Sequence, residues 1–209
     1  MSKKLIIVGS GNAALCAGIS ALEKGATVKI LEKANEYLAG GNTKYTAGAM
    51  RFVYNNGEEL KPLLKDPYDP KLEKTNFGQY TKEKFSEDLL NFNDGKPLTI
   101  EQKTLINESY ETMKWLSSHD VKFEPIYQRQ SFEKDGKFIF WGGLTLASKN
   151  EGVGLFDQEL EAFKKLGGEI EYETPVTELI KEEGKIIGVK TENNNFIADA
   201  VVLASGGFE

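Results

Sequence analysis

The apolar positions of the first thirty residues form two short runs separated by a stretch of small side chains. Residues 5–8 are a continuous apolar run that ends at Gly9, and residues 27–31, with apolar side chains at positions 28, 30 and 31, form a second segment that ends at Glu32. Runs of this length are typical of parallel strands that are covered on both faces. We therefore predict two parallel strands here, and a third apolar run, residues 200–204, predicts another strand.

The segment between the first two predicted strands has the composition of a closely packed helix. Gly25 stands where glycine commonly ends a helix. Small side chains recur along the segment, at Ala13, Ala14, Ala17, Gly18 and Ala21. This pattern predicts a β-α-β unit in which the helix packs closely on the sheet.

The middle of the chain follows a different pattern. Residues 51–77 show no clear period and contain several prolines, which favours a functional loop or an insertion. Apolar residues at 85, 89 and 92 predict a short helix, and Thr99 with Gln102 has the spacing of a capping box that opens a longer helix reaching Ser117. Residues 138–141 predict one short strand. We expect residues 51–149 to be a mainly helical or irregular insertion.

The last sixty residues return to a regular pattern. Phe156, Leu160 and Phe163 have helical spacing, and from Glu169 the apolar positions alternate with polar ones. We predict an antiparallel meander over residues 176–198, with turns at residues 183–184 and 193–194. The complete pattern predicts an α/β fold whose parallel sheet is built from strands near residues 5, 27, 169 and 200.

Candidate chemistry lies where the first two predicted strands end. Gly9 permits a tight turn, Gly11 lets the backbone approach a pyrophosphate, and Ala14 takes the place of the usual third glycine. Glu32 stands where a carboxylate can accept hydrogen bonds from both hydroxyls of an adenosine ribose, which disfavours a 2′-phosphate. We therefore predict a bound adenine dinucleotide. Its candidate contacts in this part of the chain are Gly9, Gly11, Asn12, Ala13, Ala14, Glu32 and Lys33.

Charge and cysteine content narrow the class of partner. The chain carries 26 basic and 32 acidic residues, a net charge of −6, which argues against nucleic acid or anionic membrane as a general partner. The single cysteine, Cys16, excludes an internal disulfide and is expected to be a buried structural thiol. No apolar run is long enough to span a bilayer, and residues 5–8 are too short for a signal peptide. We expect a cytoplasmic protein without a metal site.

The segment that begins at Gly40 resembles the Gly-Gly-Asn-Thr segment of the fumarate reductase and succinate dehydrogenase flavoprotein family, which lines the pyrophosphate and the flavin ring there. Backbone N–H groups of the glycines and the side chains of Asn42 and Thr43 can meet anionic oxygens at close range. The resemblance implies cofactor contacts from Gly40, Gly41, Asn42, Thr43, Ala47 and Gly48.

Three later segments resemble the same family, in the family's order. Residues 109–123 resemble its Trp-Leu to His-Gly-Val segment, and Val176 falls where the family holds the adenine through backbone groups. Residues 200–208 resemble its last strand and Gly-Gly turn, which implies contacts from Ala204, Gly206 and Gly207. The resemblance implies a Rossmann-like FAD-binding fold of the glutathione reductase type.

The resemblance also implies an activity. It implies an oxidoreductase that acts on a CH–CH bond of a small di- or tricarboxylate, with an electron donor or acceptor that it leaves unidentified. The family's covalent flavin attachment uses a histidine, and none lies between Gly40 and Met50, so FAD is expected to be held noncovalently. Two other interpretations remain open. One is a truncated, non-catalytic FAD-binding remnant. The other is an NAD-binding dehydrogenase, and the segment that begins at Gly40 disfavours this second interpretation.

The catalytic residues are not assigned. In the family, a capping domain and a final flavin-binding stretch follow the Gly-Gly turn and carry the arginine proton donor and the carboxylate-binding groups. We therefore expect residues 1–209 to be an incomplete FAD-binding domain that lacks the capping domain. His119 is expected to cap a helix. The cations Lys44, Arg51 and Arg129 are expected to be surface charges.

Overall fold

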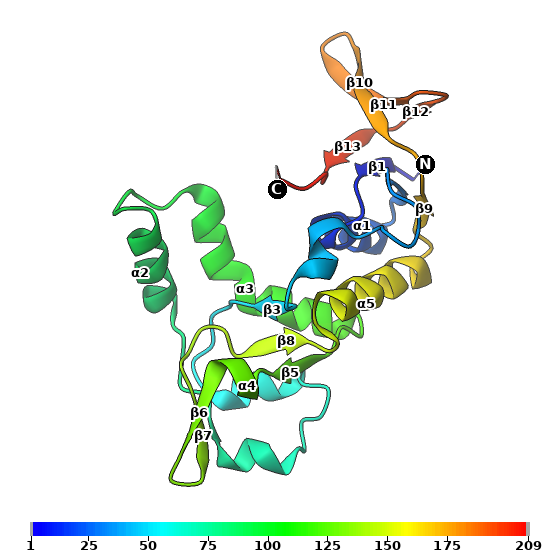
Figure 1. The fold of residues 1–209 in the computed structure, drawn as a ribbon. Coiled ribbons are helices and arrows are strands. Elements are labelled where there is room, and N and C mark those ends of the chain that lie inside the picture. The colour runs from blue at the N-terminus through cyan, green and yellow to red at the C-terminus, as the bar shows by residue number, and fades with distance from the viewer. Residues whose placement is uncertain (1, 208–209) are drawn as a thin grey trace. The chain divides into compact units, whose positions relative to one another are not determined.

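The computed structural model describes residues 2–207 and divides into two compact units (Figure 1). The first unit combines the chain up to Thr46 with the chain from Gly152 onward, and the second unit is Ala47–Glu151. Most of the sequence-predicted site residues lie in the first unit.

The first unit is built on a four-stranded parallel sheet. β1 (Lys4–Val8) lies between β13 (Ala200–Leu203) and β2 (Thr27–Leu31), and β9 (Glu169–Glu171) pairs with the far side of β2. The predicted parallel sheet and the central place of its first strand are confirmed. A central strand needs apolar residues on both faces, which explains why residues 5–8 do not alternate with polar ones.

The two faces of the sheet are covered by different elements. Ile6 joins Leu31, Val189 and Ala198 in a cluster beneath the antiparallel meander. The meander consists of β10 (Val176–Glu182), β11 (Lys185–Thr191) and β12 (Asn195–Ile197). Ile7 points to the opposite face, because successive side chains of a strand alternate. That face carries α1 (Asn12–Glu23) and α5 (Glu151–Lys165), as Figure 1 shows.

The small residues of α1 let the two helices of the first unit approach each other. A Cβ added to Gly18 would lie 2.7 Å from the ring of Phe163 on α5 and 3.4 Å from Ile7. A larger residue at position 18 would therefore force α5 away from α1. At the end of α1, Gly25 has φ +80°, the left-handed conformation that stops a helix.

The second unit combines helices with two small sheets. Its helical segments are η2 (Gly57–Leu63), η3 (Pro70–Lys74), α2 (Lys82–Phe92), α3 (Ile100–Ser118) and α4 (Tyr127–Gln130). One sheet has the order β3 (Ala49–Met50), β8 (Leu146–Ser148), β5 (Phe123–Pro125). The other has the order β4 (Thr75–Asn76), β7 (Lys137–Phe140), β6 (Ser131–Lys134).

The sequence pattern predicts some elements of the second unit but not its shortest strands. The capping box of Thr99 and Gln102 opens α3, and β7 corresponds to the strand predicted from residues 138–141. The remaining strands of the second unit are two to four residues long, too short to show a period. Apart from β7, these strands were not predicted from the sequence.

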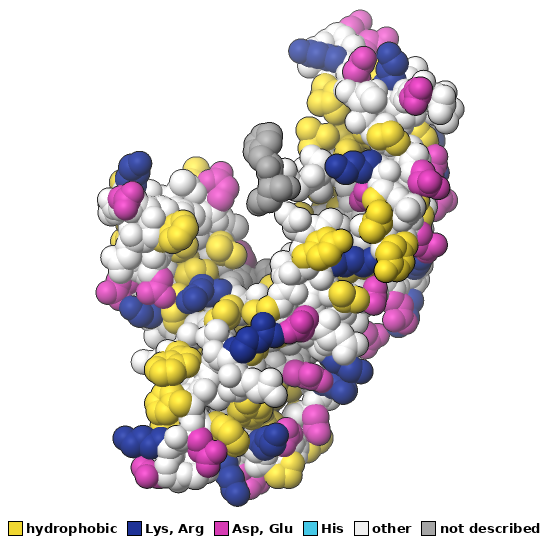
Figure 2. Space-filling view, viewed as in Figure 1, with side chains coloured by type: hydrophobic (Ala, Val, Ile, Leu, Met, Phe, Trp, Pro, Cys, Tyr) yellow, Lys and Arg dark blue, Asp and Glu magenta, His cyan; other side chains and the backbone are white. Residues whose placement is uncertain are grey.

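The face of the molecule in Figure 2 carries charged side chains of both signs together with hydrophobic ones. Acidic and basic side chains are interspersed over the face shown in Figure 2, which agrees with the small net charge. Within residues 2–207, no helix combines the length and the apolar character that a membrane span requires.

Candidate cofactor-binding site

Three neighbouring strands of the first unit end at the same edge of the sheet. β13, β1 and β2 are parallel, so the residues that follow them, Ala204, Gly9 and Glu32, lie at their carboxyl ends. Backbone hydrogen bonds hold this edge together, from Gly9 N to Leu31 O at 2.9 Å and from Ala204 N to Val8 O at 2.9 Å. In open parallel sheets this edge is where ligands bind.

Gly9 is required at this edge for two reasons. Its φ is +95°, which side chains rarely adopt. In addition, an added Cβ would lie 2.5 Å from the carbonyl oxygen of Ala204. The predicted tight turn at Gly9 is therefore present, and it also lets β13 come close to β1.

Ser10 connects three parts of the edge that are far apart in sequence. Its hydroxyl donates to Glu32 Oε2 at 2.5 Å and accepts from the N–H of Gly40 at 3.0 Å. Ser10 and Glu32 are 1% and 7% exposed. Sequence analysis did not select Ser10, because the position between the two glycines of this motif carries no fixed residue.

The Glu32 carboxylate is held in place but retains acceptor capacity. Oε1 accepts from the N–H of Ala34 at 2.8 Å, in addition to the bond between Oε2 and Ser10. A carboxylate has about four lone-pair sites, and these two bonds occupy two of them. The remaining two match the two hydroxyls of a ribose.

The Gly40 segment lies across the start of α1. Gly11 is the N-cap of α1 and has no side chain to cap it, and Asn12 N donates to Thr43 Oγ1 at 3.0 Å. A Cβ on Gly11 would lie 3.2 Å from the same Thr43 hydroxyl. Gly40, with φ +103°, precedes the short helix η1 (Gly41–Tyr45). The structure thus brings together residues that sequence analysis placed in two separate motifs.

The start of α5 fixes the other side of this segment. Gly152 N donates to the carbonyl of Thr46 at 3.0 Å, and a Cβ on Gly152 would collide with the carbonyl of Thr43. A Cβ on Gly40 would lie 2.7 Å from the ring of Phe156. Gly152 was not among the site residues predicted from the sequence. Two closely spaced glycines, at 152 and 154, at the start of a predicted helix could have indicated a close backbone contact there.

Val176 lies beside the carboxyl end of β2. It is the first residue of β10 and packs against the cluster that contains Leu31. Just before it, Thr174 N donates to the carbonyl of Glu32 at 2.8 Å. The segment predicted to hold an adenine is therefore next to the residue predicted to hold the ribose.

Other candidate residues are exposed or lie elsewhere. Ala13, Lys33, Gly41, Asn42, Gly206 and Gly207 are exposed, whereas Ala14 is buried against the core. Ala47 and Gly48 belong to the second unit, where Gly48 has φ +63° and accepts from Ser148 N at 2.9 Å. Phe208, part of the last family motif, is outside the described residues. The roles of all these residues remain predictions.

The residues of the first unit fit the adenosine diphosphate portion of a flavin dinucleotide. The N-terminus of α1 directs backbone N–H groups and the positive end of the helix dipole outward, which suits a pyrophosphate. An added Cβ on Gly41 or Gly206 would meet open space, and both residues have positive φ. Their backbones are therefore accessible to a ligand at close range.

The cationic side chains that could serve a carboxylate substrate are already engaged in other contacts. Lys44 Nζ lies 4.6 Å from the centre of the Phe156 ring and donates to Tyr37 O at 3.1 Å. Within the second unit, Arg51 donates to Tyr80 Oη at 3.0 Å and lies 3.6 Å from Asp88 Oδ2. Arg129 likewise pairs with Glu151.

His119 caps a helix, as its sequence position predicts. It is the C-cap residue of α3, and its ring lies 4.9 Å from the ring of Trp115 in an edge-on arrangement.

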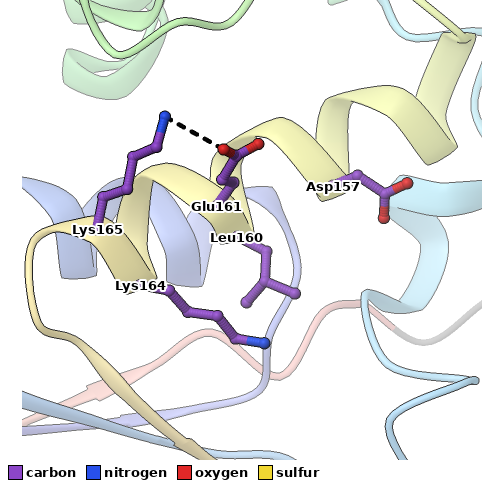
Figure 3. Close-up of a pocket in the computed structure, with 5 residues that line it drawn as sticks. All are labelled: Asp157, Leu160, Glu161, Lys164 and Lys165. Carbon is purple, nitrogen blue, oxygen red and sulfur yellow. Dashed lines mark ion pairs between the residues drawn. The ribbon is translucent and has the colours of Figure 1, made fainter.

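A shallow hollow on α5 is unrelated to this edge. It is lined by side chains of one helix only, Asp157, Leu160, Glu161, Lys164 and Lys165 (Figure 3). Glu161 and Lys165 form an ion pair across it at 3.2 Å. A cofactor site draws converging groups from several elements, so this hollow is not a candidate.

The comparison with family models decides the class of this protein. Residues 4–208 match the model described as FAD dependent oxidoreductase (DAO). The chain belongs to the FAD-dependent oxidoreductases. FAD is therefore its cofactor, and the match favours FAD over NAD.

Relatives and solved structures refine this picture. The chain is 29% identical to a urocanate reductase of Eggerthella lenta over 98% of its length and 31% of that protein. It is 27% identical to a fumarate reductase (cytochrome) of Shewanella frigidimarina, over 98% of its length and 33% of that protein. An open flavocytochrome c3 fumarate reductase structure shares the fold, with a TM-score of 0.69 and 20% identity over 99% of this chain and 34% of that one.

These matches confirm the resemblance to the fumarate reductase flavoproteins. They extend along nearly the whole chain, as the order of the motifs predicted. The chain spans about a third of the length of the relatives it matches.

Proposed function

We propose that this chain is the FAD-binding part of an oxidoreductase that acts on a carbon–carbon bond of a small carboxylate. The observation that carries the proposal is the arrangement of Glu32, Ser10 and Gly40 beside the N-terminus of α1. This arrangement brings together the acceptor for the ribose, Glu32, the pyrophosphate site at the start of α1, and the Gly40 segment, which resembles a segment that contacts flavin. Family membership and the relatives support the same function.

Each part of the edge has a distinct binding role. Glu32 accepts hydrogen bonds from the ribose hydroxyls, and the first N–H groups of α1 meet the pyrophosphate. Backbone groups near Val176 hold the adenine, and the segments beginning at Gly40 and Gly206 line the remainder of the dinucleotide. When bound, FAD supplies hydride transfer at its isoalloxazine ring. The described residues bind and orient it noncovalently.

The proposed substrates are small unsaturated or saturated carboxylates. The names of the relatives point to urocanate and fumarate. The opening of the chain, from Asn12 to Ala17, also resembles that of tricarballylate dehydrogenases, so tricarballylate is a third candidate. The electron donor or acceptor is not identified by any of these features. We place the protein in the cytoplasm.

The proposal is tested by purifying the chain, adding FAD and recording the visible spectrum. We expect the spectrum of a weakly and noncovalently bound flavin, which is released on denaturation. The chain is then assayed with fumarate, urocanate and tricarballylate, using reduced viologen or an acceptor dye. We expect little or no turnover by these 209 residues, because Lys44, Arg51 and Arg129 are already engaged.

The assay also separates the two remaining interpretations. Turnover would contradict the expectation that these residues lack a complete catalytic site, and it would show that they supply a proton donor. Flavin binding without turnover, in the chain and in every longer form of the protein, would support a non-catalytic FAD-binding protein. Failure to bind FAD would contradict the proposed function.

A further inference from the structure

A buried carboxyl group lies behind the start of α1. Glu159, on α5, is 0% exposed, and its Oε1 lies 3.7 Å from Cys16 Sγ on α1. Its Oε2 has no hydrogen-bond partner in the described part of the chain. An ionised carboxylate with a single weak thiol contact would be costly in this position. The proposed binding site does not use this group directly.

Two oxygen atoms compete for the single proton of the Cys16 thiol. Cys16 Sγ contacts two oxygen atoms, Asn12 Oδ1 at 3.3 Å and Glu159 Oε1 at 3.7 Å. A thiol has one proton, and Asn12 Oδ1 is an acceptor only. If the thiol donates to Asn12, then the contact between Cys16 and Glu159 needs a proton on the carboxyl group. A protonated Glu159 satisfies both contacts, whereas an ionised one competes with Asn12 for the thiol proton.

This chain of contacts orients the side chain of Asn12. When Oδ1 accepts from Cys16, one turn further along α1, the Nδ2 group points the other way. Asn12 is the first residue of α1, and its backbone N–H already donates to Thr43. The amide Nδ2 is therefore available as a further donor at the helix N-terminus, where anions bind.

We propose that Glu159 is a positioning residue, kept as a neutral carboxylic acid, which acts through Cys16 to hold the Asn12 amide as a donor to the pyrophosphate of FAD. The inference rests on the proposed function, because it assigns a pyrophosphate to the start of α1. Burial raises the pKa of Glu159 to about 8. Burial also raises the pKa of the Cys16 thiol, which is therefore protonated.

Infrared spectroscopy tests the protonation state without any cofactor. At a pH about two units below 8, a protonated carboxylic acid gives a carbonyl band distinct from the carboxylate bands. We expect one such band in the wild-type chain, present in the Glu161→Gln control on the same helix and absent from Glu159→Gln. A spectrum that is the same in Glu159→Gln and wild type would overturn the neutral acid.

A double-mutant cycle tests whether Cys16 acts through Asn12. We expect Asn12→Ala to weaken FAD binding about tenfold, and Cys16→Ala about threefold. In the Asn12→Ala background, Cys16→Ala should have no further effect, because the amide that it positions is gone. Independent effects that multiply would contradict a positioning role.

Two variants of Glu159 complete the test. Glu159→Gln keeps a neutral group that can donate to Cys16 and should bind FAD within about twofold of wild type, whereas Glu159→Leu should match Cys16→Ala. If Glu159→Leu does not fold, as judged by circular dichroism, the infrared band and the FAD affinity of Glu159→Gln still test the role of Glu159. A wild-type chain that binds no FAD contradicts the proposed function and the positioning role, while the infrared band still decides whether Glu159 is neutral.

Discussion

The hydroxyl of Ser10 donates a 2.5 Å hydrogen bond to Glu32 Oε2 and accepts the N–H of Gly40 at 3.0 Å. A single small side chain thus fixes the acid predicted to hold the ribose and the glycine that opens the segment across α1. Both bonds are buried. Ser10 therefore positions two binding elements that are distant in sequence.

Replacing Ser10 by alanine should weaken both folding and cofactor binding. The change leaves the buried N–H of Gly40 without its partner and removes a charge-assisted bond to Glu32, at a cost of about 1–3 kcal/mol in the free energy of unfolding. Urea denaturation and FAD titration measure the two effects. The control is Ser86→Ala, whose hydroxyl bonds only within α2. Equal behaviour of the two variants would contradict the role of Ser10.

Replacing Glu32 by alanine should weaken FAD binding by about 1–3 kcal/mol. The change removes two charge-assisted hydrogen bonds to the ribose. Glu36→Ala is a suitable control, because Glu36 is on the same connection but its side chain is 71% exposed. Isothermal titration of each variant with FAD measures the difference. Unchanged affinity in Glu32→Ala would remove Glu32 from the site.

A pair of glycine variants separates close packing from backbone strain. Gly9 and Gly25 both have positive φ, +95° and +80°. An added Cβ meets Ala204 O at 2.5 Å in the first case and nothing within 4 Å in the second. We expect Gly25→Ala to cost about 1 kcal/mol of stability and Gly9→Ala clearly more. Equal losses of unfolding free energy in urea denaturation would show that the close approach of Ala204 to Gly9 makes no additional contribution to stability.

The raised pKa of Glu159 predicts a pH dependence of stability. Its folded pKa is about 8, against an ordinary value of 4.5, so between these values the folded state holds the extra proton. The free energy of unfolding should therefore fall as the pH rises from about 5 towards 8, by up to a few kcal/mol. Chemical denaturation of wild type and Glu159→Gln across this range isolates the effect. Parallel pH profiles for the two proteins would rule out this contribution.

The sequence predicted the elements that contain strong local patterns. The first β-α-β unit was predicted from three local patterns: the apolar run before Gly9, the small residues of α1 and the acid after β2. Each pattern follows from a single structural requirement of this unit. The meander followed from period-two alternation. The short strands of the second unit leave no local pattern. One of them, β3 at Ala49–Met50, depends on a pairing partner about a hundred residues away.

The missed residues of the site have similar explanations. Ser10 occupies a variable position of its motif, and only the fold brings it to Gly40. Glu159 did leave a signal, because it falls on the same helical face as Phe156 and Phe163, where a charged residue is unusual. Periodicity alone could have selected it as a buried acid, but not shown that it meets Cys16.

The most direct test of the central claim is a titration of the purified chain with FAD, followed by fluorescence and compared with Glu32→Ala and Gly11→Val. The account predicts saturable one-to-one binding by the wild-type chain, weakened by about 1–3 kcal/mol in Glu32→Ala. Gly11→Val should bind more weakly still, because its side chain would occupy the space of the pyrophosphate. Absence of saturable binding by the wild type, or equal affinity in all three proteins, would contradict the account.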